Sequence, residues 1–110
     1  MKYVDDIKKY QPFNEQEMKD KALMLQFIER NPDHLLRDNI TAHLTSSAIV
    51  VNPSKTKVLF AYHNIYDSWS WVGGHNDGDP DMLKVAIKEA KEETGISNVK
   101  VLSNDIFMLD

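Results

Sequence analysis

The chain has 110 residues, of which 42% are hydrophobic and 27% are charged, and its formal net charge is −4. This composition is typical of one soluble, cytoplasmic globular domain, and its longest apolar runs are too short to span a membrane. The lack of cysteine excludes disulfides and thiolate metal sites, and the acidic balance argues against binding of long nucleic acids, which requires clustered Lys and Arg.

The first forty residues have the pattern of helices. Apolar residues recur at helical spacing over residues 18–28, and a shorter helical segment precedes them. Asn14 and Glu17 form a plausible capping pair at the start of the longer helix, and Pro32 ends it because the residue before a proline avoids the helical region. We therefore predict an N-terminal helical extension over residues 1–40.

From residue 41 onward the pattern changes to strands. Residues 45–51 (TSSAIVV) and 57–62 (KVLFAY) are rich in β-branched and apolar side chains. The segment 52–55 (NPSK) between them is a turn sequence, since proline fixes its own backbone angle and does not extend a central strand. These segments predict a β-hairpin at the start of a second unit that covers residues 41–110.

Further strands are predicted in the same unit. After a turn at residues 64–68, a short strand covers residues 69–72 and is expected to end at Gly73-Gly74. Its two tryptophans point to one face, and we expect them to pack in the core rather than to stack on a base. Residues 99–109 (VKVLSNDIFML) are again strand-like. Helices followed by strands, a helix and a strand predict an α+β (mixed α/β) fold.

The segment over residues 73–96, GGHNDGDPDMLKVAIKEAKEETGI, contains the best-marked helix. Asp79 is the predicted N-cap, Pro80 falls at the first helical position, and Gly95 suits the left-handed position just after the end. At about 100° per residue, one apolar arc of this helix is the predicted core face. Its members are Met82, Leu83, Ala86, Ile87 and Ala90.

Three carboxylates, those of Glu89, Glu92 and Glu93, fall within a neighbouring arc of this helix, with lysines on the far side. Such an acidic flank is often only a solvated face, where like charges cost about 0.2–0.5 kcal/mol per pair. In a sheltered site the same charges at ~5 Å would repel by about 3 kcal/mol, and a dication would remove this repulsion. Mg²⁺ and Mn²⁺ prefer such oxygen ligands. Three glycines in the preceding loop allow the main chain to approach a ligand closely.

This segment resembles the signature of Nudix hydrolases, G-x5-E-x7-R-E-U-x-E-E-x-G-U, where U is a bulky apolar residue. The residues in register with the signature are Gly74, Glu89, Glu92, Glu93, Gly95 and Ile96. The similarity extends upstream through the strand WSWVGG to the strands HLTSSA and KVLF, so that it covers residues 43–96.

Two positions depart from the signature. Pro80 stands in place of its first glutamate and Lys88 in place of its arginine, two residues that in the family support the metal-binding glutamates. Lysine keeps the positive charge but lacks the planar, bidentate guanidinium. The neighbouring Asp79 and Asp81 could partly replace the missing carboxylate.

The resemblance implies a Nudix-like α/β/α sandwich, with the C-terminal part of the domain missing from this chain. An incomplete sandwich would leave apolar surface uncovered, so a homo-oligomer is a possible arrangement. The implied activity is metal-dependent hydrolysis of the pyrophosphate bond in a nucleoside diphosphate linked to another moiety. The alternative is a catalytically weak or inactive Nudix-like module that binds a nucleotide or a partner, which the two departures favour.

The resemblance also implies roles for single residues. Glu89, Glu92 and Glu93 would be the catalytic residues and, together with the main-chain carbonyl of Gly73, would hold Mg²⁺ or Mn²⁺. The implied substrate-binding residues are Gly74, His75 and Lys88. The identity of the nucleoside diphosphate derivative does not follow from the signature, because loops outside it usually select the substrate.

Overall fold

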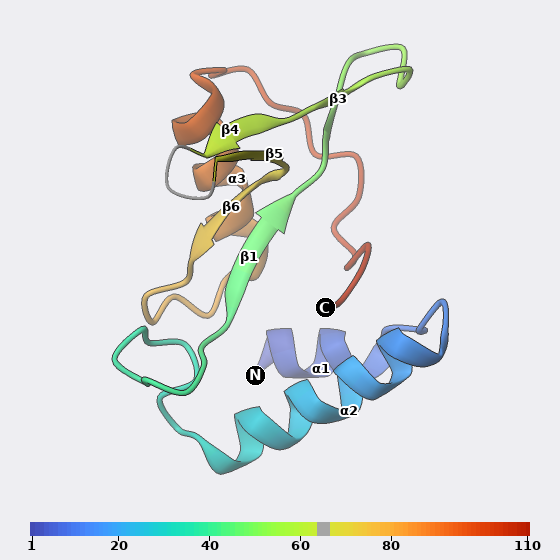
Figure 1. The fold of residues 1–110 in the computed structure, drawn as a ribbon. Coiled ribbons are helices and arrows are strands. Elements are labelled where there is room, and N and C mark those ends of the chain that lie inside the picture. Colours follow the sequence, from blue (N-terminus) through green and yellow to red (C-terminus); the bar gives the residue numbers. More distant parts are fainter. Residues whose placement is uncertain (64–66) are drawn as a thin grey trace.

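The computed structural model describes residues 1–63 and 67–110, which form three helices and six strands. In chain order these are α1 (Lys2–Lys9), α2 (Glu15–Arg30), β1 (Thr45–Ala48), β2 (Val50–Val51), β3 (Val58–Leu59), β4 (Ala61–His63), β5 (Ser68–Ser70), β6 (Val72–His75) and α3 (Met82–Thr94). The predicted α+β class is confirmed (Figure 1). The Nudix-like arrangement of its layers stays a prediction.

Helix α2 begins and ends where its local signals lie. The Asn14 side chain accepts a hydrogen bond from the Glu17 N–H at 2.8 Å, which confirms the predicted cap. The Glu17 carboxylate in turn accepts from the Phe13 N–H at 2.9 Å, one residue before the position expected for a capping box. At the other end Asn31 is extended and Pro32 follows, as predicted. No helix in the described ranges has the length and hydropathy needed to cross a membrane.

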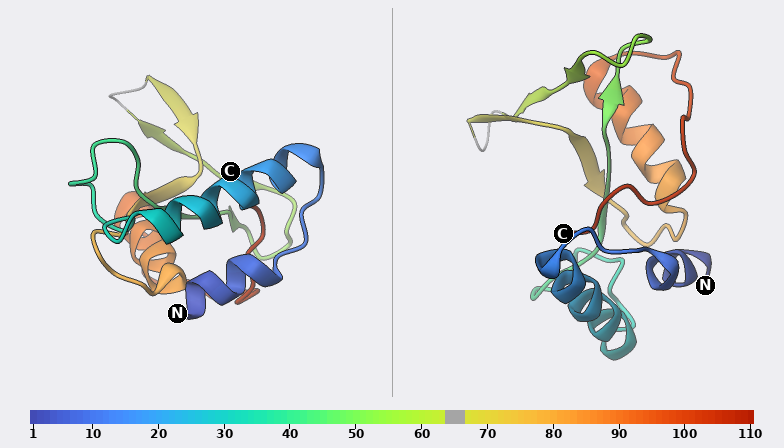
Figure 2. Two further views of the ribbon diagram at one scale, coloured as in Figure 1. Left: turned by 90° about the horizontal axis from the view of Figure 1, so that it is seen from below. Right: turned by 90° about the vertical axis from the view of Figure 1, so that its right-hand side faces the viewer.

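The buried apolar cluster joins the two ends of the chain. Its buried members are Tyr3, Ile7, Tyr10, Ile28 and Leu109. Partly buried Leu44 and Met82 also pack against it, so the strand unit and α3 contact the N-terminal helices through the same cluster. In Figures 1 and 2 the C-terminal end accordingly lies beside α1 and α2.

The strand predicted over residues 99–109 is wrong, because this segment is irregular throughout. Its apolar side chains are used in a different way: Ile106 and Leu109 pack on the helical cluster. The Tyr10 hydroxyl also donates a hydrogen bond to the Phe107 carbonyl at 3.2 Å. The segment therefore covers the N-terminal helices instead of extending a sheet.

The strands form three antiparallel two-stranded ladders, β1–β6, β2–β3 and β4–β5. The predicted hairpin is confirmed for β2 and β3, which pair Val50 with Leu59 and Val51 with Val58. The Asn52 side chain closes the turn by accepting hydrogen bonds from two main-chain N–H groups. Residues 45–51 do not form one strand, however, because β1 pairs with β6 whereas β2 pairs with β3. The predicted turn at residues 64–68 falls largely on residues 64–66, outside the described residues.

The two glycines lie inside β6 and do not end the strand, which corrects the prediction. Gly73 pairs with Ser47 and Gly74 with Ser46 in the β1–β6 ladder. A Cβ atom on Gly73 would lie only 2.6 Å from the Ser47 Cβ atom, so the strands approach each other closely here. Helix α3 packs against both strands of this ladder (Figure 2).

Helix α3 begins two residues later than predicted. Its N-cap is Asp81, whose side chain accepts from the Lys84 N–H at 3.1 Å. The Asp79 carboxylate instead accepts from the Asp81 N–H at 2.9 Å and pairs with the Lys84 ammonium group at 3.0 Å. Two acidic residues flank Pro80, and only the second has a helical N–H within reach. The C-terminal prediction is confirmed, since Gly95 adopts the left-handed conformation at φ 73°.

The buried side of α3 also differs from the predicted one. Ala86 and Ala90 are buried as expected, but Val85 is buried in place of Leu83, which is 37% exposed. The buried arc is therefore rotated toward Val85. This rotation places Glu89 and Glu93 on the side of α3 that packs against the sheet.

Candidate functional site

Two of the three predicted glutamates lie on the packed side of α3. At about 100° per residue, Glu89 and Glu93 fall between Val85 and Ala86, two residues that the sheet covers. Both glutamates are half-buried, whereas Glu92 is exposed. An apolar residue would be the ordinary choice at positions that face a sheet. The two carboxylates therefore occupy positions that packing alone does not explain.

The Glu89 carboxylate lies directly against Gly74. A Cβ atom built on Gly74 would come within 2.5 Å of the carboxyl carbon and 2.7 Å of both carboxylate oxygens. A residue larger than glycine would force this carboxylate away from the strand. The first glycine and the first matched glutamate of the signature, fifteen positions apart, are thus brought together in space.

The loop between β6 and α3 is held by a buried asparagine that sequence reasoning missed. Asn76 is 3% exposed. Its side-chain oxygen accepts from the Ser46 hydroxyl at 2.8 Å, and its amide donates to the Asp79 carbonyl at 2.8 Å. Asp77 and Gly78 both have positive φ, so residues 76–79 form a tight turn of the type that Asp-Gly sequences favour. The Asn-Asp-Gly sequence was the available signal.

An ion pair clamps this turn from outside. The Arg37 guanidinium donates two hydrogen bonds to the Asp77 carboxylate, each at 2.8 Å. The Gly78 N–H donates to the Leu35 carbonyl at 2.9 Å, so that the segment after α2 lies along the turn. The guanidinium holds the pKa of Asp77 below its ordinary value and is itself held protonated, because the pair stabilises both charges. This contact was also missed.

Asp79 and Asp81, which flank Pro80, both form hydrogen bonds at the N-terminus of α3. The Asp81 N–H and the Lys84 ammonium group lower the pKa of Asp79, and Asp81 caps α3. Both carboxylates therefore have partners of their own beside Pro80. Lys88, in the position of the family's arginine, is exposed on α3.

His75, a predicted substrate-binding residue, ends β6. Side chains alternate along a strand, so His75 points to the face of the ladder opposite Gly74 and Glu89. It contacts another histidine there, His43, with 2.7 Å between the Nε2 atom of His43 and the Nδ1 atom of His75. The structure therefore separates His75 from the glutamates.

A groove of about 310 Å³ adjoins the two glycines. Hydroxyl side chains line much of it: Thr45, Ser46, Ser47, Ser68 and Ser70. Trp71, at 40% exposure, also lines the groove, and Trp69 is 67% exposed, so the expected core packing of the tryptophans is wrong. Trp69 lies in β5, whereas Trp71 lies between β5 and β6, so the strand predicted over residues 69–72 is divided at Trp71. A groove of hydroxyls with an aromatic wall suits a polar ligand that carries a planar ring.

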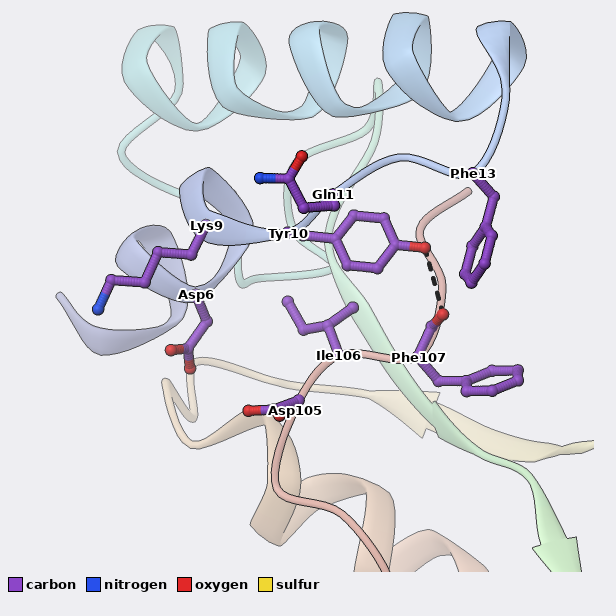
Figure 3. A pocket seen from close by; sticks show the side chains of 8 residues that line it. All are labelled: Asp6, Lys9, Tyr10, Gln11, Phe13, Asp105, Ile106 and Phe107. Atoms are coloured by element: carbon purple, nitrogen blue, oxygen red, sulfur yellow. Dashed lines mark hydrogen bonds between the residues drawn. The ribbon is translucent and has the colours of Figure 1, made fainter.

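A second cavity, of about 470 Å³, lies between α1 and the C-terminal segment (Figure 3). Figure 3 shows the Tyr10 ring and Ile106 directed into it, with Phe13 and Phe107 at one end. Burial and the neighbouring Glu17 carboxylate raise the pKa of Tyr10 to about 12. None of the predicted site residues lines this cavity.

Within residues 1–63 and 67–110, no group of three or more His, Asp or Glu side chains is arranged so that it could hold a metal ion. Of the predicted metal ligands on α3, Glu89 is thus the one that the structure shows against the strand, at Gly74, and half-buried Glu93 lies one turn further along the same side of the helix. Comparisons of the chain with models of protein families and with curated proteins find no match.

Proposed function

We propose that this protein is a metal-dependent hydrolase that cleaves the pyrophosphate bond of a nucleoside diphosphate linked to another moiety. The observation that carries the proposal is the contact between the Glu89 carboxylate and Gly74. Gly74 lies within a strand and has no positive φ, so a turn does not explain why this position is glycine. The space that the glycine leaves for the Glu89 carboxylate is the explanation that supports the proposal. A glycine that makes room for a carboxylate is expected where the carboxylate has a ligand to bind.

The chemistry of these residues suits a hard divalent cation, which prefers oxygen ligands. Glu89 and Glu93 are half-buried one turn apart on α3, where their charges repel more strongly than at an exposed surface. Oxygen ligands from these two residues, from Glu92 and from the Gly73 carbonyl would hold Mg²⁺ or Mn²⁺ after the three carboxylates turn toward one another, because they are not grouped for a metal ion in the described ranges. When bound, the cation would orient the pyrophosphate and offset the charge that develops on it.

The other residues of the chain would position the substrate. The main chain at Gly74 and His75 offers hydrogen bonds to phosphate oxygens. No residue of α3 lines the groove, so its hydroxyl groups and exposed Trp71 would contact the sugar and the base of a substrate that extends past β6. Lys88 adds a positive charge on α3, one turn before Glu92. One glutamate of the group would accept the proton of the attacking water.

The test is turnover of a panel of nucleoside diphosphate derivatives with and without Mg²⁺ or Mn²⁺. We expect metal-dependent turnover that falls by about 100-fold or more in Glu92→Gln and in Glu93→Gln, with the fold intact. Glu29→Gln, which changes an exposed glutamate of α2, is the matched control and should keep full turnover. Undiminished turnover in both test variants would remove these glutamates from the mechanism.

A second candidate, a module that binds a nucleotide without turnover, is favoured by one observation. Asp79 and Asp81 are both engaged at the N-terminus of α3, so neither carboxylate replaces the glutamate that Pro80 displaces. Such a module would be stabilised by a nucleoside diphosphate derivative, because a ligand that binds only the native state raises the melting temperature. The ligand would be recovered uncleaved after prolonged incubation with Mg²⁺.

A further inference from the structure

A pair of histidines joins two segments of the chain on the far side of the β1–β6 ladder. His43 lies two residues before β1, and His75 is the last residue of β6, opposite Thr45. The Nε2 atom of His43 is 2.7 Å from the Nδ1 atom of His75, and the ring centroids are 4.8 Å apart. The two imidazoles therefore meet through ring nitrogens rather than by stacking alone.

We propose that His43 and His75 form a binding site for a divalent transition-metal ion such as Zn²⁺, separate from the glutamates of α3. Neutral imidazole nitrogens suit Zn²⁺, Ni²⁺ and Cu²⁺, whereas carboxylates suit Mg²⁺ and Mn²⁺. The two sites lie on opposite faces of the ladder, because Gly74 faces α3 and its neighbour His75 faces away. This proposal is independent of the proposed hydrolase function.

The burial of His43 determines which of its nitrogens a metal can reach. The Nδ1 atom of His43 is buried and has no hydrogen-bond partner among the described residues. The Nε2 atom of His43 is therefore the ring nitrogen that can bind a metal ion, and this atom is directed at His75. In the pair without metal one proton lies between the rings. A tautomer shift that moves this proton to an outer ring nitrogen leaves two lone pairs directed at one point.

Metal binding requires the two rings to tilt and to separate, because lone pairs that face each other along a hydrogen bond must meet at the tetrahedral angle on Zn²⁺. Two nitrogens bound to a tetrahedral Zn²⁺ at about 2.0–2.1 Å are roughly 3.3 Å apart, so the rings would have to separate by about 0.6 Å. His75 is exposed and lies on the rim of the hydroxyl-lined groove, which leaves room for this movement and for water in the open coordination positions. Two ligands with open positions define an exchangeable site rather than a closed structural one.

The charges around the pair favour a cation. The Asp77 carboxylate lies close enough to both histidines to interact with them electrostatically, and its own oxygens are held by Arg37. The guanidinium offsets part of the negative charge and keeps the carboxylate out of the site. The histidines are thus the nitrogen donors, and Asp77 contributes a favourable field.

The test is a calorimetric titration of the intact chain with Zn²⁺ alone. We expect one Zn²⁺ per chain, with affinity reduced at least about tenfold in His75→Ala and in His43→Ala, the loss expected for removal of one of two ligands. Glu29→Gln, which changes an exposed glutamate of α2, is the matched control and should leave Zn²⁺ affinity unchanged. Because His75 is exposed, its variant should keep the circular dichroism spectrum and melting temperature of the unsubstituted chain.

A second measurement does not depend on variants. Zn²⁺ should shift the imidazole C–H resonances of His43 and His75 together, whereas the same concentration of Mg²⁺ should leave them in place. The proposal is overturned if Zn²⁺ does not bind, if His75→Ala binds Zn²⁺ as tightly as the unsubstituted chain, or if Glu89→Gln removes Zn²⁺ binding.

Discussion

The carboxylate of Glu89 occupies the space where Gly74 would carry a side chain. The contact joins the middle of β6 to the middle of α3 and leaves a charged group at a packed position. It therefore links a feature of the fold, the close approach of helix and strand, to the proposed site.

Gly74→Ala should remove function with little effect on stability. The added methyl would displace the Glu89 carboxylate, which is the end of a flexible side chain, so the unfolding free energy should change by less than about 1 kcal/mol. Metal-dependent turnover should be lost, because a displacement of about 1 Å in such a group is costly to catalysis. Chemical denaturation and turnover measure the two effects separately.

A double-mutant cycle tests whether the effect acts through Glu89. In a Glu89→Ala background, Gly74→Ala should reduce turnover no further, since the displaced group is already absent. A Gly74→Ala variant with full turnover, or additive losses in the cycle, would show that the contact has no functional role.

Asn76→Ala should destabilise the protein by about 1–3 kcal/mol. The substitution leaves the Ser46 hydroxyl and the Asp79 carbonyl, both bonded to Asn76, without this partner in a buried setting. Urea denaturation gives the free energy of unfolding. Ser46→Ala, which removes only one of these bonds, should cost less. Equal stability of Asn76→Ala and the unsubstituted chain would contradict a structural role for this asparagine.

The elements that could be predicted are those with local signals. Asn14 and Gly95 mark helix ends through their own backbone and side-chain chemistry, and the turn at Asn52 marks a hairpin. The start of α3 could not be predicted, because Asp79 and Asp81 flank Pro80 and either could be the N-cap. Which one caps the helix depends on which main-chain N–H its carboxylate reaches. The segment ending at Leu109 was misassigned since its apolar residues pack on helices at the other end of the chain.

The candidate site was predictable only in part. The spacing of Glu89 and Glu93 places them on one side of a helix, whatever the tertiary structure. Their position on the buried side depends on how α3 rotates against the sheet, and the contact with Gly74 depends on the position of β6. Arg37 meets Asp77 across 40 residues of sequence, a distance at which no local pattern connects two side chains.

The Arg37–Asp77 pair should make stability depend on acid pH. Arg37 holds the pKa of Asp77 below its ordinary value of 3.8, so the folded state favours the charged carboxylate. The stabilisation is present above that ordinary value and is lost as the pH falls through the lowered pKa of the folded state. Asp77→Asn keeps the left-handed backbone that Asn tolerates and removes the charge.

Melting curves from neutral pH down to about pH 2 measure this effect. Asp77→Asn should be less stable than the unsubstituted chain near neutrality, and the difference should shrink in acid. Arg37→Gln should behave in the same way. A difference that stays constant with pH would contradict the pair's contribution.

Ionisation of Tyr10 should lower the stability of the fold at alkaline pH. Burial and the Glu17 carboxylate raise its pKa to about 12, above the ordinary value of 10.0. The neutral phenol therefore stabilises the fold below pH 10.0, and this contribution is lost as the pH rises through about 12. Tyr10→Phe removes the bonds to Glu17 and to the Phe107 carbonyl and should cost about 1–2 kcal/mol near neutrality. The cost should diminish in alkali, and a constant cost across this range would contradict the assignment.

Paramagnetic broadening by Mn²⁺ tests most directly whether the glutamates of α3 hold a divalent cation. At substoichiometric Mn²⁺, the amide resonances of residues 73–75 and 89–95 should broaden first, and Glu92→Gln should abolish the effect. Amides of these residues that stay sharp, or broadening confined to the surroundings of Asp77 and Asp79, would contradict the proposed metal site and with it the hydrolase.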